Sequence, residues 1–208
     1  MGGVFLKLIE KSILVGFILT ILFNCLGFSS NCKGINNKIL RLHILANSDS
    51  KQDQELKLKV RDKILDFSKD YLKNVSTKEE AELLMKGNLS EIKKVAEEEI
   101  IRQGYNYPVA IELKETYFTT REYENFTLPA GNYEALRVLI GDAKGHNWWC
   151  VMFPALCIGV SKQESNKKID SVLNKDESNI VENKCKYEFR FKTLECINNV
   201  KNWFSGWF

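Results

Sequence analysis

The sequence lacks an excess of charge of either sign and has few residues that bind metals. Its formal net charge is +3, from 30 basic and 27 acidic residues, and it contains 2 histidines and 6 cysteines. A chain this close to neutrality has no electrostatic footprint for nucleic acid. Its cysteines and histidines show none of the short paired spacings of a zinc ribbon, and "IGDAKGHN" lacks the Gly-Lys-Ser/Thr end of a phosphate loop. We therefore expect no nucleic-acid partner, no metal and no cofactor.

The first thirty residues contain the longest apolar run. Lys7, Glu10 and Lys11 precede the uncharged stretch "ILVGFILTILFNCLGF" over residues 13–28. This pattern predicts export, with residues 1–30 acting as a signal peptide or as a retained membrane anchor. The run is shorter than the roughly 20 residues of a usual spanning helix, and Gly27 and Ser29 offer a weak cleavage site after Ser29. Cleavage is therefore favoured over an anchor, and an ordinary buried helix is the third alternative.

The next part of the chain predicts a strand followed by helices. Residues 39–46 are short and apolar, as in a strand, and Ser50 with Asp53 resembles a capping box at a helix start. A second capping pair, Thr77 and Glu80, begins another helical region that "KGN" over 86–88 would split and that Gly104 would end. The amphipathic face of the first helix is given by apolar residues at helical spacing, which are Leu56, Val60, Ile64, Phe67 and Tyr71.

The following part is rich in β-branched and aromatic residues. We expect strands near 109–115, 117–125 and 132–141, and another strand in "YEFRFKTLE" from its alternation of Tyr187, Phe189 and Phe191 with polar residues. Residues 161–184 have no aromatic side chain and balanced charges, which predicts a flexible loop. The apolar stripe at 197–207 predicts core packing, with contact to a membrane interface as the alternative.

These elements predict an α+β fold in a single domain over residues 35–208. Two or three amphipathic helices would pack on a mostly antiparallel sheet, since the helices and the strands occur largely in separate runs. The apolar export segment would precede this domain.

The stretch "AKGHNWWCVMFPALC" concentrates residues that can carry chemistry. His146 beside Cys150 allows a Cys-His nucleophile, and His146, Cys150, Cys157 and Cys185 are enough in number for a metal site, but neither has the expected spacing. In an exported chain a Cys150–Cys157 disulfide is a stronger candidate, provided that the chain bends at Pro154. Free buried thiols are nevertheless favoured over this disulfide.

Two polar blocks are candidates for contact with a partner. "HILANSDS" is explained by helix capping, with a recognition loop of His43, Asn47, Ser48 and Asp49 as the alternative. In "GHNWWC", strand alternation would turn Trp148 and Trp149 to opposite faces, so that one fills the core and the other, with the polar side chains of His146 and Asn147, meets a partner.

Three longer blocks carry a resemblance. "RLHILANSDSKQDQELKLKVRDKIL", "FTLPAGNYEALRVLIG" and "GHNWWCVMFPALC" resemble, in this order, the hallmark blocks of the stage II sporulation protein R family. The resemblance implies a signal that is made in the forespore and exported to the space between the septal membranes. There it would activate a membrane-embedded aspartic protease of the mother cell that processes pro-sigma-E.

The protein would then be a ligand without catalytic residues, held in the membrane by its N-terminal segment if that segment is not cleaved. The alternatives are an exported cell-wall enzyme that uses Cys150 or Asp49, and a structural protein of the septum.

Overall fold

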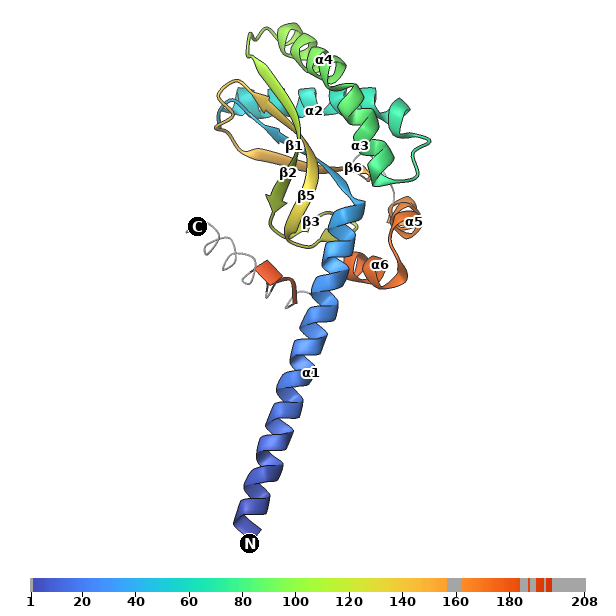
Figure 1. Cartoon of the computed structure of the whole chain (residues 1–208). Helices are drawn as coiled ribbons and strands as arrows, with labels where there is room; N and C mark the ends of the chain where they lie inside the picture. The colour runs from blue at the N-terminus through green and yellow to red at the C-terminus, as the bar shows by residue number, and fades with distance from the viewer. Residues whose placement is uncertain (1, 157–161, 184–186, 188–189, 193, 196–208) are drawn as a thin grey trace.

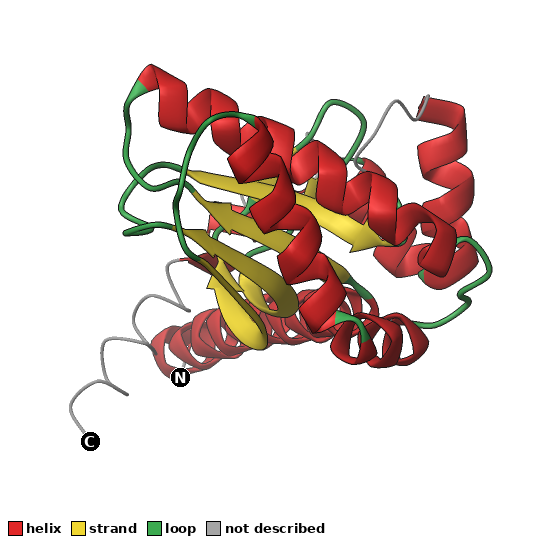
Figure 2. Ribbon diagram, turned by 90° about the horizontal axis from the view of Figure 1, so that it is seen from above, coloured by secondary structure: helices red, strands yellow, loops and turns green. Residues whose placement is uncertain are grey.

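The computed structural model describes residues 2–156, 162–183, 187, 190–192 and 194–195. Four strands form a sheet in the order β2-β5-β1-β6, which lies between helical layers, and β3 and β4 form a small separate ribbon (Figure 1 and Figure 2). The fold is thus α+β, as predicted. In chain order the elements are α1 (Gly2–Lys38), β1 (Leu40–Leu45), α2 (Lys51–Leu72), α3 (Lys78–Gly87), α4 (Leu89–Arg102), β2 (Val109–Phe118), β3 (Arg121–Glu122), β4 (Thr127–Leu128), β5 (Gly131–Ile140), β6 (Asn147–Phe153), α5 (Lys162–Val172) and α6 (Lys175–Glu182).

The sheet is mostly antiparallel, as expected, but its central pair is parallel. β2 runs antiparallel to β5, and β6 antiparallel to β1, whereas β1 and β5 run in the same direction. Parallel neighbours need a crossover, and here α2, α3, α4 and β2 supply it. The strand predicted over 117–125 does not exist as one unit, because β2 continues to Phe118 and only Arg121–Glu122 pair with β4.

The helix boundaries follow the capping residues that the sequence predicts. The side chains of Ser50 and Thr77 accept hydrogen bonds from the backbone N–H groups of Asp53 and Glu80. Asn88 separates α3 from α4, as "KGN" predicts. Beyond α4, Gly104 adopts a φ of 83°, which a glycine tolerates without strain, and its N–H bonds to the carbonyl of Ile101.

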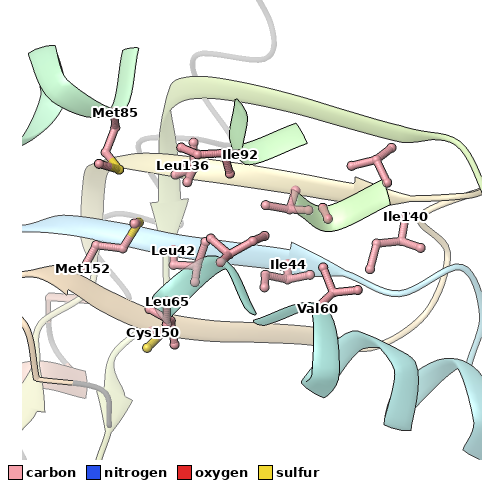
Figure 3. Close-up of a cluster of buried hydrophobic side chains, with 14 of the residues drawn as sticks. Leu42, Ile44, Val60, Leu65, Met85, Ile92, Leu136, Ile140, Cys150 and Met152 are labelled. Atoms are coloured by element: carbon pink, nitrogen blue, oxygen red, sulfur yellow. The ribbon is translucent and has the colours of Figure 1, made fainter. Parts of the chain in front are cut away.

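The main hydrophobic core lies between the sheet and α2, α3 and α4. Figure 3 shows side chains from both layers in contact, among them Leu42 and Ile44 of β1 and Val60 of α2. Of the predicted face of α2, Leu56, Val60 and Ile64 are buried and Phe67 packs against the core, whereas Tyr71 is 41% exposed. In the last turn of the helix, Leu72 and not Tyr71 packs against the core.

A second core covers the opposite face of the sheet, and α1 enters it. Phe28, Cys32, Ile35 and Ile39 are buried there, so the folded unit includes residues before the predicted start at 35. α1 runs without a break from the apolar segment into this core and projects far beyond the domain (Figure 1). Its projecting part exposes apolar side chains, including Phe17 at 63%. Within the described residues, no helix meets the length and hydropathy of a membrane-crossing segment.

The prediction of a flexible loop over 161–184 is wrong for residues 162–182. They form α5 and α6, and the second begins with a full capping box between Asn174 and Glu177. Ile169, Leu173 and Ile180 are buried in the second core. A few apolar residues on one side are enough to hold two short helices against the core, although Ser165, Glu177 and Ser178 are buried with them.

The prediction of a strand at 187–195 is also wrong where the structure describes it. Tyr187, Arg190, Phe191 and Lys192 are helical. Tyr187 and Phe191 are four residues apart, a spacing that places both on one helical face as well as on one strand face, and both contact Phe28. The stripe at 197–207 lies outside the described residues.

Candidate functional site

The two polar blocks of the sequence meet at one end of the sheet. β1 and β6 are antiparallel neighbours in which Leu45 pairs with Asn147, so the loop that leaves β1 lies beside the loop that enters β6. The N–H of Gly145 donates to the carbonyl of Ala46 at 2.9 Å, which extends the pairing into the loops. We call residues 46–50 and 141–147 together the loop pair.

Glycine is required where the two loops touch. A Cβ on Gly145 would lie 2.2 Å from the backbone oxygen of Ser48, too close for any other residue without a backbone shift. Gly141 has a φ of 57°, and a Cβ there would lie 2.3 Å from the side-chain oxygen of Asn47. That oxygen accepts a hydrogen bond from the N–H of Asp142 at 3.0 Å. The two loops of the loop pair are therefore interlocked, because each glycine allows a close approach that a side chain at its position would prevent.

Asp53 is the centre of the hydrogen bonds beneath the loop pair. Its side chain, 5% exposed, accepts from Asn47 Nδ2 at 2.9 Å and from Ser48 Oγ at 2.5 Å. Burial would raise the pKa of this carboxyl group, but hydrogen bonds from Ser48, Asn47, Tyr107 and Ser50 outweigh burial and lower the pKa below its usual value. Asp53 therefore stays ionised and fixes the conformation of the first loop.

Asp49 and His146 connect the two loops at the surface. The Asp49 carboxylate accepts from the backbone N–H of His146 at 2.6 Å and makes a short contact with Nδ1 of its ring. These bonds, the side-chain bond first, lower the pKa of Asp49. The two side chains are 55% and 80% exposed, so the pair faces solvent and is open to a partner.

Lys57 supports the same surface from below. Its ammonium group donates to the backbone oxygen of His146 at 2.8 Å and to Gln54 Oε1 at 2.6 Å, and the residue is only 4% exposed. Burial lowers its pKa, against the opposing effect of the Asp49 carboxylate. The lysine thus joins α2 to the second loop.

The two tryptophans lie on opposite faces of β6, as strand alternation predicts. Trp148 packs against the main core, with the Arg61 guanidinium 4.3 Å from the centre of its ring. Trp149 packs against the second core, with the Arg121 guanidinium at 3.4 Å. Both are half-buried, and both indole nitrogens are buried without a hydrogen-bond partner. Each ring is therefore partly open to solvent through its carbon atoms, whereas its nitrogen is enclosed; large, partly exposed aromatic rings are frequent interface anchors.

Comparison with known proteins identifies the family. The chain matches the family model described as stage II sporulation protein R over residues 36–163, which include the whole loop pair and both tryptophans. The chain belongs to the stage II sporulation protein R family. It is 38% identical over 150 residues to stage II sporulation protein R of Bacillus subtilis (strain 168), a match that covers 67% of each chain. No solved structure matches the chain.

His43 does not belong to the loop pair of this family member. It lies within β1, is 7% exposed, and contacts Phe118 and Trp149 edge-on. Burial first, and then the charges of Arg137 and Arg41, lower its pKa to about 4, against the opposing effect of a side-chain hydrogen bond with Asn147. The structure therefore places His43 inside the sheet, apart from the three other residues of the predicted recognition loop, of which Asp49 bonds to His146 at the surface while Asn47 and Ser48 bond to Asp53 beneath it.

Cys150 is 2% exposed and disulfide-bonded. A disulfide sulfur is not a thiolate, so Cys150 is no nucleophile while this bond is intact. Cys157 lies outside the described residues, and its pairing with Cys150 stays a prediction. Cys32, by contrast, is a free buried thiol whose pKa burial raises to about 12. In the described part of the chain, no three His, Cys, Asp or Glu side chains gather as metal ligands would.

Sequence reasoning missed the support that α2 gives to the loops. It assigned Asp53 only to a helix cap and did not consider Lys57. A usable signal was present, because Asp53 and Lys57 continue the spacing of Val60 and Ile64 and so place two charged residues on a buried helical face. Buried charges are rare unless they are paired.

Proposed function

We propose that this chain is an exported sporulation signal that activates a membrane-embedded aspartic protease of the mother cell. The protease would then remove the pro-sequence of sigma-E. The observation that carries this proposal is the family match over residues 36–163. In this proposal the chain is exported from the forespore to the space between the septal membranes by its N-terminal apolar segment, and it acts as a ligand and not as an enzyme.

The loop pair is our candidate for the contact with the protease. It presents Asp49, His146 and Asn147 at the surface, and the half-buried tryptophan rings follow on opposite faces of β6. Polar side chains around half-buried aromatic rings are typical of interfaces, where the rings carry most of the binding energy. The interlocked backbone favours tight binding, because little conformational entropy is lost when a rigid loop meets its partner.

The test is a reconstitution in cells that do not sporulate. The protease and pro-sigma-E are produced together, with or without this chain exported to the outer face of the membrane, and cleavage of pro-sigma-E is followed. We expect cleavage only with the chain present. The double variant Asp49→Ala/His146→Ala should lose it, whereas Lys94→Ala, an exposed change on α4, should retain it. Cleavage that does not depend on the chain would refute the proposal.

A cell-wall enzyme remains the second candidate, because Asp49 holds a ring nitrogen of the exposed His146 as in a carboxylate–imidazole pair. Its prediction differs from that of the signal. Purified chain would release products from peptidoglycan, and Asp49→Ala would abolish that release without any protease present. A folded chain that releases nothing excludes this candidate.

A further inference from the structure

A cavity of about 530 Å³ lies at the other end of β6 from the loop pair. Its walls are the C-terminal half of α2, the end of β6 with the following turn, and α5. The volume falls within the range of about 300–1,000 Å³ that is usual for small-molecule sites. The interior is mostly apolar and is formed by Leu65, Leu72, Val75, Met152, Phe153 and Val172. This interior fits a hydrophobic body of modest size.

The charged residues at this cavity are mostly positive. Lys69 of α2, Lys73 at the C-cap of α2 and Lys168 of α5 line it, and among the described lining residues Asp66 alone is acidic. The Lys168 ammonium group donates to the backbone oxygen of Ala155 at 2.8 Å, which holds it beside the turn that follows β6. The C-terminal dipole of α2 accounts for lysines in its last turn, but it does not account for a third lysine that comes from another helix.

Ser68 provides the independent sign of a ligand. It is 1% exposed and lines the cavity, and its hydroxyl group has no hydrogen-bond partner. A buried hydroxyl without a partner destabilises the folded state by about 1–3 kcal/mol. A ligand with an oxygen acceptor would satisfy this hydroxyl, whereas a purely hydrocarbon ligand would leave it unpaired.

We propose that this cavity binds a small amphiphilic anion, with an aromatic or alicyclic body and a carboxylate or sulfonate group. The body occupies the apolar interior, and the anionic group lies between the lysines and within reach of the Ser68 hydroxyl. A cationic ligand is disfavoured by three ammonium groups, and a neutral one gains nothing from them. This site is separate from the loop pair, so it does not rest on the function proposed above.

The test uses photolabelling of the full chain in phosphatidylcholine nanodiscs, which cover the exposed apolar side chains of α1. The probe is 4-benzoylbenzoate, and neutral benzophenone is the control. We expect 4-benzoylbenzoate to label peptides that line the cavity in a saturable way, and benzophenone to need at least about ten times the concentration. Equal half-saturating concentrations for the two probes, or labelling mainly elsewhere, would overturn the proposal.

Two sets of variants test the charge and the space separately. The triple variant Lys69→Gln/Lys73→Gln/Lys168→Gln should raise the half-saturating concentration about tenfold, since each exposed pair contributes a modest amount. The matched control Lys63→Gln/Lys94→Gln/Lys114→Gln removes the same charge from exposed positions outside the cavity and should change nothing. Ser68→Leu should block labelling by filling the cavity, and Val172→Phe does the same if Ser68→Leu fails to fold. Unchanged labelling in the triple variant, or in a folded filling variant, would show that the probe binds elsewhere.

Discussion

Replacing Asp53 by asparagine should destabilise the protein far more than a single exposed charge would. The carboxylate accepts hydrogen bonds from Asn47 and Ser48 on one oxygen and is 5% exposed. A hydrogen bond to a charged group contributes about 1.5–3 kcal/mol. In Asp53→Asn the charge is lost, and in one orientation of the amide its NH₂ group faces two donors. We expect the free energy of unfolding to fall by about 2–4 kcal/mol, a large part of the roughly 5–15 kcal/mol of a typical domain.

The measurement is urea unfolding at neutral pH, followed by circular dichroism, with Asp70→Asn as the matched control. Asp70 lies on the same helix, is exposed, and should change the free energy of unfolding by less than about 0.5 kcal/mol. If Asp53→Asn costs no more than Asp70→Asn, the hydrogen bonds beneath the loop pair contribute nothing to stability and our account of the site fails.

The pH dependence of the same pair of proteins provides a second check. The pKa of Asp53 is lowered in the folded protein from its usual 3.8, because its hydrogen bonds outweigh its burial. The stabilisation by Asp53 is therefore complete above about pH 5 and is lost as the pH falls below 3.8 toward the folded pKa. The difference in stability between the native protein and Asp53→Asn should be constant from pH 5 to 7 and should shrink on further acidification. A difference that grows with acidification would show the opposite sign of the pKa shift.

Three further changes address the loop pair and the second core. Gly145→Ala should lower stability by about 1–3 kcal/mol, because its Cβ would lie 2.2 Å from a backbone oxygen of the facing loop, and a melting temperature within a degree of the native value would contradict this. Trp148→Ala and Trp149→Ala should be compared for melting temperature and for pro-sigma-E cleavage. Loss of an interface anchor weakens binding by about 2 kcal/mol, so cleavage should fall further than the folded fraction for at least one of the two variants. A chain that begins at Ile35 should fold but be about 3 kcal/mol less stable in urea than one that begins at Gly27, since only the longer chain keeps Phe28 and Cys32, which are 7% and 1% exposed, in the second core. Equal stability of these two chains would mean that these two side chains add nothing to the core.

The helices α2, α3 and α4 could be predicted because their signals are local. Ser50 and Thr77 cap their helices through bonds that span three residues, and Gly104 ends α4 by a conformation that depends on one residue. The parallel pairing of β1 with β5 could not be predicted, since it depends on a crossover of three helices and a strand and not on any feature of β1 itself. Tyr187 and Phe191 show the same limit at short range, because a spacing of four fits both a strand and a helix.

The sequence named polar residues that the structure brings together at the loop pair, but it did not name the residues that support them from below. Asn47, Ser48, Asp49, His146 and Asn147 were named from their polarity, and the structure brings them together because β1 and β6 are antiparallel neighbours. The roles of Asp53 and Lys57 depend on the hydrogen-bond partners that the fold brings to them, and these partners cannot be read from the sequence. His43 was misplaced for a similar reason: a polar residue inside an apolar strand can be buried when aromatic rings enclose it.

The unbroken course of α1 has a mechanical consequence. Helix rise is about 1.5 Å per residue, so the stretch from Ile9, which is 44% exposed, to Phe28 in the core forms a rigid rod of about 30 Å. A flexible tether would let the domain tumble and sample every direction, whereas this rod fixes both the height and the angle at which the domain stands above any surface that takes up the exposed apolar side chains. Another molecule on that surface could then contact the loop pair only if its binding site lay at the same height and orientation. An inserted flexible linker would remove this alignment, so the domain would reach more positions but spend less time at each of them.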